Sequence, residues 1–302
     1  MDKKELAAEV QRLKKEKNAV ILAHNYQIGE VQDVADYVGD SFGLAQKAAE
    51  SDAEVIIFCG VHFMAESAKI LAPEKKVILP VKEAGCPLAD MAEVEEVRAK
   101  KKEHPEAAVV AYVNTSAAVK AEIDVCCTSS NAVQVVESLP QEEILFLPDK
   151  NLGHYISQKT DKKIIIWEGY CVTHHRVDPE ELDKVRENHP GAPIAVHPEC
   201  PPEIVQGADY VGGTSGILKF ARETEAQTVV IGTEMGMLHR LQKENPEKTF
   251  YLLSPRLICV NMKKTTLEKV LLSLQELAPE IEVEEDIARR AKQSLERMLA
   301  IK

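Results

Sequence analysis

Three cysteines in this chain of 302 residues follow hydrophobic runs, and their positions suggest shared chemistry. Cys86 follows VILPVKEAG, Cys171 lies within IIIWEGYCVTHH, and Cys259 follows FYLLSPRLI. Cysteine is often just a small buried hydrophobe, but three at matched positions favour a common ligand. Structural zinc usually takes four ligands, whereas three thiolates suit a 4Fe–4S cluster with one iron left open. Such an iron is a Lewis acid that can bind a hydroxyl or carboxylate and assist loss of water.

These cysteines belong to a long internal repeat, whose copies start near His24, Tyr112 and His197. Each copy has an apolar residue followed by Asp, and a hydroxyl five positions later. The pairs are Asp36 with Ser41, Asp124 with Ser129, and Asp209 with Thr214. A period this long indicates a whole small domain. We therefore expect three related domains, at residues 1–88, 89–175 and 176–302, the last one including C-terminal helices that have no counterpart upstream.

The elements that position these residues are alternating strands and helices. Apolar runs predict buried strands at 19–23, 109–113 and 194–196, each opening one copy of the repeat, and a strand at 77–81 that leads to Cys86. Alternation of this kind predicts parallel sheets covered on both faces. The fold class expected is α/β, with three homologous three-layer α/β/α domains arranged with pseudo-threefold symmetry around a central iron–sulfur cluster.

Polar residues follow the first strand of each repeat, where ligands of parallel sheets bind. They form three pairs: His24 with Tyr26, Tyr112 with Asn114, and His197 with Glu199. Histidine beside a carboxylate or phenol is suited to acid–base work or to carboxylate binding. The next polar site, after Cys171, is His174 or His175, and the sequence does not choose between them.

The repeated hydroxyls allow two interpretations. Ser41 and Ser129 are placed to cap the helices at 42–49 and 131–139, and Thr214 lies just before a helix at 217–223. Alternatively, the free N–H groups of these helix starts form anion sites around one axis.

Composition narrows the class of protein. The formal net charge of −12 argues against a nucleic-acid surface or an anionic membrane as partner. No apolar run approaches the ~20 residues of a membrane span, and the amphipathic N-terminus does not look like a signal peptide. Seven cysteines without a signal sequence indicate a reducing compartment, so we expect a cytoplasmic protein. Of the other thiols, adjacent Cys126 and Cys127 are not expected both to point inward.

The motifs together resemble the quinolinate synthase family, the A enzyme of de novo NAD synthesis, over essentially the whole chain. The matching segments are HNYQ, GDSFGLA, GVHFMAESAK, GCPLADM, AYVNTSAAVKAEIDVCCTSSNA, PDKNLG, GYCVTHH, HPEC and CVNMKKTTLEK. One departure is Gly213, where the family pattern leads us to expect Ser before Thr214.

The resemblance implies that Cys86, Cys171 and Cys259 hold a 4Fe–4S cluster. The implied reaction condenses iminoaspartate with dihydroxyacetone phosphate, releasing phosphate and two waters, and L-aspartate oxidase is the implied upstream partner. Catalytic roles would fall to Tyr26, Tyr112, Glu199 and His24, with Glu199 as general base. Substrate oxygens would be bound by His24, Ser41, Tyr112, Asn114, Ser129, His174, His197, Glu199 and Thr214.

Two other functions fit some of these features. An enzyme of the diphthamide-synthesis type also has three similar domains with one cluster cysteine each, but it would not need HNYQ and HPEC. A non-catalytic iron–sulfur or phosphometabolite sensor would leave Tyr26 and Glu199 without a task.

Overall fold

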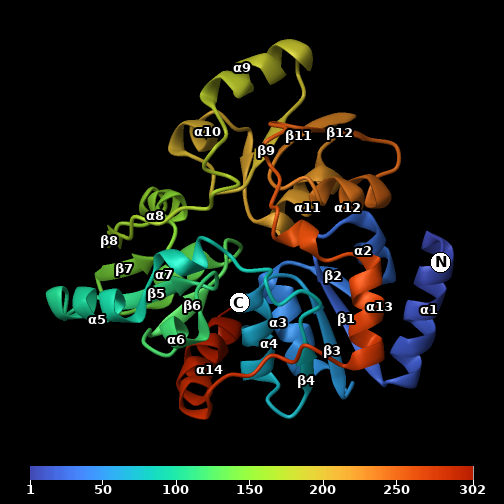
Figure 1. Cartoon of the computed structure of the whole chain (residues 1–302). Coiled ribbons are helices and arrows are strands. Elements are labelled where there is room, and N and C mark those ends of the chain that lie inside the picture. Colours follow the sequence, from blue (N-terminus) through green and yellow to red (C-terminus); the bar gives the residue numbers. More distant parts are fainter. Residues whose placement is uncertain (302) are drawn as a thin grey trace.

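The computed structural model describes residues 1–301, whose strands form three separate four-stranded parallel sheets (Figure 1). The order is β2-β1-β3-β4 in the first sheet, β6-β5-β7-β8 in the second and β10-β9-β11-β12 in the third. Each sheet thus has the same order within its own unit, and the three units surround a common centre (Figure 1). The expected α/β class with three parallel sheets is confirmed. The domain boundaries at 88/89 and 175/176 stay a prediction.

The first two units hold most of the expected elements. The first unit consists of α1 (Lys3–Glu16), β1 (Ala19–His24), α2 (Gly29–Val34), β2 (Tyr37–Gly39), α3 (Ser41–Glu50), β3 (Val55–Cys59), α4 (His62–Leu71) and β4 (Lys76–Ile78). The second consists of a 3₁₀ turn (Ala89–Met91), α5 (Val94–Glu103), β5 (Ala108–Tyr112), α6 (Ala117–Lys120), β6 (Val125–Cys127), α7 (Ala132–Ser138), β7 (Glu143–Leu147), α8 (Lys150–Ser157) and β8 (Lys163–Ile166).

The third unit repeats the pattern and is followed by the tail. It consists of α9 (Pro179–Asn188), β9 (Ile194–Val196), α10 (Pro202–Gln206), β10 (Tyr210–Val211), α11 (Thr214–Glu223), β11 (Thr228–Gly232), α12 (Met237–Glu244), β12 (Thr249–Leu252) and a 3₁₀ turn (Met262–Lys264). The tail consists of α13 (Leu267–Glu276) and α14 (Glu285–Ala300).

The aspartate that marks each repeat ties the second strand region to the first strand. The Asp36 carboxylate accepts the backbone N–H of Ile21 at 2.8 Å, while the Asp36 N–H donates to the Ile21 carbonyl at 2.9 Å. Asp124 with Val109 and Asp209 with Ile194 repeat this reciprocal pair. The repeated Asp is therefore a structural residue that holds the start of the second strand region against the first strand.

The tail helices join the units. Helix α13 packs on α1 and β3 of the first unit, whereas α14 packs against α4 of the first unit and against α6 and β6 of the second (Figure 1). A single buried cluster of side chains includes residues of all three units, such as Leu22, Phe146 and Ile231. Burial of apolar surface therefore stabilises the arrangement around the centre as well as each sheet.

Two local predictions were wrong. Cys126 and Cys127 are both fully buried, because β6 is covered on both faces and successive side chains point to opposite faces. The Cys126 thiol faces Ser294 of α14 at 3.5 Å. The strand expected at 77–81 ends at Ile78, where the chain forms an antiparallel bridge with Glu280 of the tail.

The described residues also bear on membrane association. Among residues 1–301 no helix combines the length and apolar character needed to cross a bilayer.

Candidate active site

One cavity of about 70 Å³, partly open to solvent, lies where the carboxyl ends of the three sheets meet. Every residue proposed from the sequence lines it: His24, Tyr26, Ser41, Cys86, Tyr112, Asn114, Ser129, Cys171, His174, His197, Glu199, Thr214 and Cys259. The structure thus brings together side chains that are up to 235 positions apart in the chain, from His24 to Cys259. Their roles stay predictions at this point.

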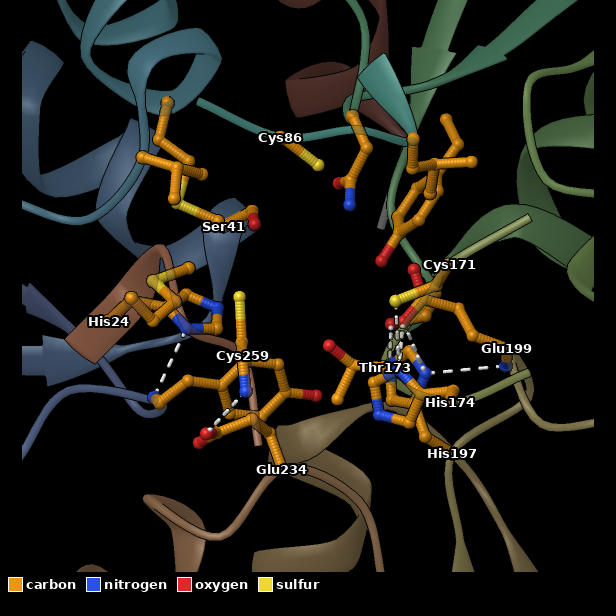
Figure 2. A pocket seen from close by; sticks show the side chains of 18 of the residues that line it. His24, Ser41, Cys86, Cys171, Thr173, His174, His197, Glu199, Glu234 and Cys259 are labelled. Carbon is orange, nitrogen blue, oxygen red and sulfur yellow. Dashed lines mark hydrogen bonds and ion pairs between the residues drawn. The ribbon is translucent and has the colours of Figure 1, made fainter. Parts of the chain in front are cut away.

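The three thiols point into the cavity from three sides (Figure 2). Each cysteine opens a single turn, because its carbonyl accepts the N–H of the residue four positions on, at 3.2 Å for Cys86, 2.9 Å for Cys171 and 3.2 Å for Cys259. Backbone N–H groups two or three residues on also lie near each sulfur and lower the pKa of its thiol: Leu88 and Ala89, His174, and Asn261 and Met262, respectively. One local structure therefore presents a sulfur three times.

These surroundings fit a metal cluster. Burial raises the pKa of the Cys86 thiol to about 12, and it also raises the pKa values of Cys171 and Cys259. Without a cation the thiols stay protonated, whereas bound iron would favour the thiolates that the backbone N–H groups already face. Three sulfurs from three directions match a cluster ligated at three of its four irons.

Glu199 lies between two histidines in the cavity wall (Figure 2). Its Oε2 is 2.8 Å from His174 Nδ1 and 3.2 Å from His197 Nδ1, and all three side chains are almost fully buried. Burial alone would raise the pKa of Glu199, but attraction to His197 and His174 outweighs it and lowers that pKa. The geometry therefore keeps a buried carboxylate ionised beside two imidazoles with which it can exchange a proton.

The choice between the two adjacent histidines is settled by their placement. His174 faces the cavity, and its Nε2 lies 2.9 Å from the hydroxyl of Thr233. His175 instead contacts the Asn151 amide and lies with its ring centroid 4.5 Å from that of Tyr170, tilted by 39°. Of the two histidines, His174 is therefore the one that lines the cavity.

Two tyrosines reach the same space. The Tyr26 hydroxyl bonds to Thr233 at 2.7 Å, so this threonine connects it with His174. Burial, together with the nearby Glu199 carboxylate, raises the pKa values of Tyr26 and Tyr112 well above normal. Both phenols therefore remain protonated and can donate hydrogen bonds or protons.

Burial disfavours the protonated form of the two histidines, His24 and His197, that end or follow the first strand of their units. Burial lowers the pKa of His24 to about 4, and burial likewise lowers the pKa of His197. His197 Nε2 lies 3.0 Å from the hydroxyl of Ser129, which comes from the second unit. Neutral imidazoles can both donate and accept, so they suit the binding of polar substrate atoms.

The hydroxyls do not cap helices as expected. Asp40, not Ser41, caps α3 by accepting the N–H of Gly43 at 2.8 Å. Ser129 lies two residues before Asn131, which holds the N-cap position of α7. Thr214 is the first residue of α11, and the Asn25 amide donates to its hydroxyl at 2.8 Å. The capping interpretation was wrong, because these side chains turn toward the cavity instead.

Two buried polar atoms in the cavity wall have no partner within residues 1–301: Asn114 Oδ1 and Glu199 Oε1. Buried polar atoms are nearly always bonded, and an unpaired one is destabilising by roughly 1–3 kcal/mol. Their position suggests that a bound molecule forms hydrogen bonds with them.

Gly213 lies close to two serines of the second unit. A Cβ at this position would lie 2.7 Å from the hydroxyls of Ser129 and Ser130, so the glycine allows this close approach.

Sequence reasoning missed several polar residues around the cavity. Asp40 accepts hydrogen bonds from Ser130 at 3.2 Å and Ser215 at 2.6 Å, and so joins all three units. Thr233 and Glu234 follow β11, where the sequence GTEMG resembles an ordinary loop. The one available signal was their position after a strand, like that of the residues after β1 and β9.

The comparisons with known proteins decide the family. The model of the family described as quinolinate synthetase A protein matches residues 8–300. The chain belongs to the quinolinate synthase family. The chain is 55% identical to quinolinate synthase of Alkaliphilus metalliredigens over the full length of both proteins. It is 54% identical to that of Geobacter sp. strain M21, with 100% of this chain and 99% of the relative covered.

A third relative is similar to the chain over its full length. Quinolinate synthase 1 of Methanosarcina acetivorans is 51% identical, covering 100% of this chain and 99% of its own length. The expected family is therefore confirmed, and the chain is an enzyme of that family.

Proposed function

We propose that this chain is a quinolinate synthase of NAD biosynthesis that condenses iminoaspartate with dihydroxyacetone phosphate, releasing phosphate and two waters. The observation that carries the proposal is the meeting of thirteen strand-end and loop residues from three units in one cavity. The full-length similarity to proteins named quinolinate synthase supports the same reaction. An upstream L-aspartate oxidase would supply the iminoaspartate, which hydrolyses readily.

Cys86, Cys171 and Cys259 would hold a 4Fe–4S cluster, which supplies a Lewis acid when bound. The chain supports this by aiming backbone N–H groups at each sulfur. Partial burial of the cavity would limit the access of bulk water to the cluster. The seven free thiols agree with a reducing, cytoplasmic setting.

Glu199 is the proposed general base. Its ionised carboxylate has one oxygen on the two histidines and leaves Oε1 free to take a proton from the substrate. His174 and His197 hold the carboxylate in place, and Thr233 orients His174 through Nε2. Tyr26 and Tyr112, protonated and buried, are suited to donate protons to leaving hydroxyls.

Anionic groups of the substrates would be bound by neutral donors, since the acidic chain brings few cations to the cavity. The hydroxyls of Ser41 and Thr214 lie at the N-termini of α3 and α11, ten-residue helices whose first N–H groups favour anions. The remaining proposed contacts are the side chains of His24, Asn114, Ser129, His174 and His197.

Replacement of the proposed base tests the function. Glu199→Gln keeps the size of the side chain but removes its basicity, so we expect turnover of reconstituted, anaerobic enzyme to fall about 10²–10⁴-fold. Iron and sulfide content should be unchanged. Glu187→Gln, on an exposed face of α9, is the matched control. Near-normal turnover by Glu199→Gln would remove Glu199 from this role, and no product from the unsubstituted enzyme with both substrates would refute the function.

A further inference from the structure

Three possible metal ligands of different types lie together in the cavity wall. The Cys171 sulfur, the His174 ring nitrogen and a Glu199 carboxylate oxygen all lie within 4.8 Å of one another. His174 Nδ1 is 3.2 Å from the Cys171 sulfur and 2.8 Å from Glu199 Oε2. Figure 2 shows the three side chains converging on one side of the cavity. Neither Cys86 nor Cys259 is a member of this group.

We propose that the chain, when it lacks its cluster, binds a single zinc ion through Cys171, His174 and Glu199. Thiolate, imidazole and carboxylate are the three ligand types that zinc takes in proteins. One thiolate and one carboxylate also balance the dication, which is needed where His174 and Glu199 are only 1% and 2% exposed.

The spacing suits a tetrahedral ion. Zinc bonds of about 2.0–2.3 Å place neighbouring ligand atoms roughly 3.3–3.8 Å apart. The separations between His174 Nδ1 and its two neighbours, 3.2 Å and 2.8 Å, are slightly shorter than this, as is usual for groups in direct hydrogen-bond contact. Small movements of the side chains would therefore admit the ion, with loss of the Cys171 thiol proton and of any proton on His174 Nδ1.

The surroundings fix the histidine for this role. Thr233 Oγ1 lies 2.9 Å from His174 Nε2, so the second ring nitrogen is held by a neighbouring group, as is usual for metal-bound histidines. The fourth position would face the cavity and hold a water molecule. Three protein ligands with one open position are typical of zinc sites that are not purely structural.

The zinc site and the cluster would exclude each other, since both need Cys171. Zinc would occupy one cluster ligand and the proposed base together, so a zinc-loaded chain could be neither reconstituted nor active. This consequence rests on the proposed function. The zinc site itself does not, because its ligands are defined by the geometry alone.

The test uses the full-length chain stripped of iron by a chelator. Calorimetric titration with Zn²⁺ should show one equivalent, and Co²⁺ should give one equivalent with a thiolate charge-transfer absorption. We expect Cys171→Ser and His174→Gln each to weaken binding by about 100-fold or more, since loss of a supporting group alone weakens metal sites by 10–100-fold. Thr233→Val should weaken it by about tenfold.

Cys86→Ser and Cys259→Ser are the discriminating controls. They should bind Zn²⁺ as the unsubstituted chain does, although both remove a proposed cluster ligand. Circular dichroism identifies any variant that fails to fold, and the two ligand variants provide independent tests. The proposal is overturned if the chain binds no Zn²⁺, if Cys171→Ser and His174→Gln bind it normally, or if binding requires Cys86 and Cys259. None of these outcomes depends on quinolinate formation.

Discussion

The second and third units place a carboxylate at the same position, two residues after their third strand, but surround it differently. Asp149 follows β7 and Glu234 follows β11, and both are fully buried. Each accepts the backbone N–H of the cavity cysteine of its own unit, Cys171 at 2.9 Å and Cys259 at 3.0 Å. The first unit has Val61 at this position.

The difference lies in the charge that faces each carboxylate. Glu234 Oε2 is 2.9 Å from the Lys263 ammonium. Asp149 is held by backbone N–H groups, such as that of Leu152 at 2.8 Å, and within the described part of the chain no cation pairs with it. Burial, together with the charge of Glu199, raises the pKa of Asp149 well above normal.

A residue near each carboxylate also contacts the next unit. Lys263 donates to the carbonyl of Tyr26 at 2.5 Å, and the Asn151 amide donates to the carbonyl of Glu199 at 2.9 Å. Tyr26 and Glu199 are equivalent residues of the repeat. The same connection is therefore made by the Lys263 ammonium, which is also paired with Glu234, between the third and first units, and by a neutral amide between the second and third.

The largest effect is expected for Lys263→Met. It leaves the Glu234 carboxylate buried without a cation, which should lower the free energy of unfolding by about 3 kcal/mol in urea titrations at pH 7. Lys184→Met, which changes an exposed lysine, is the control. A loss no greater than that of the control would show that the Lys263–Glu234 ion pair does not stabilise the fold.

Glu234→Gln should have a smaller effect, about 2 kcal/mol, because the Lys263 side chain is 19% exposed and water can partly solvate the ammonium. The amide still accepts one N–H, so the loop that carries Cys259 should stay folded. The double variant Glu234→Gln with Lys263→Met should lose less than the two single losses added together, as expected for groups in direct contact. Additive losses would contradict the pairing.

The sequence predicted the parts of this arrangement that depend on strands. Buried apolar runs located β1, β5 and β9 nearly to the residue, and ligands of parallel sheets gather at such strand ends, so the cavity residues followed. The repeat strengthened this prediction, because polar residues follow the first strand in all three copies. Short elements such as α6 and β10 span too few residues to show a period.

Other features depend on contacts that the order of residues does not display. Asp149 is also the cap of α8, so its sequence context indicates a helix start and nothing more. Its bond to Cys171, 22 positions away, appears only once β7 and β8 lie side by side. Likewise, Lys263 reaches Tyr26 because the third unit packs against the first.

The smallest effect is expected for Asp149→Asn, and it should depend on pH. Because the folded pKa of Asp149 is raised, its stabilising contribution is fully present below the unfolded value of ~3.9 and is lost as pH rises through the folded pKa. The variant should therefore be less stable than the unsubstituted chain at pH 4.5, and should approach it to within about 1 kcal/mol at pH 8.

Urea titrations of both chains at several pH values measure this difference. Asp183→Asn, on the exposed side of α9, should show no such trend and serves as the control. A constant penalty at every pH would mean that the pKa of Asp149 does not differ between the folded and the unfolded chain. The proposed difference between Glu234, which is paired with Lys263, and Asp149, which has no cation beside it in the described part of the chain, would then be wrong.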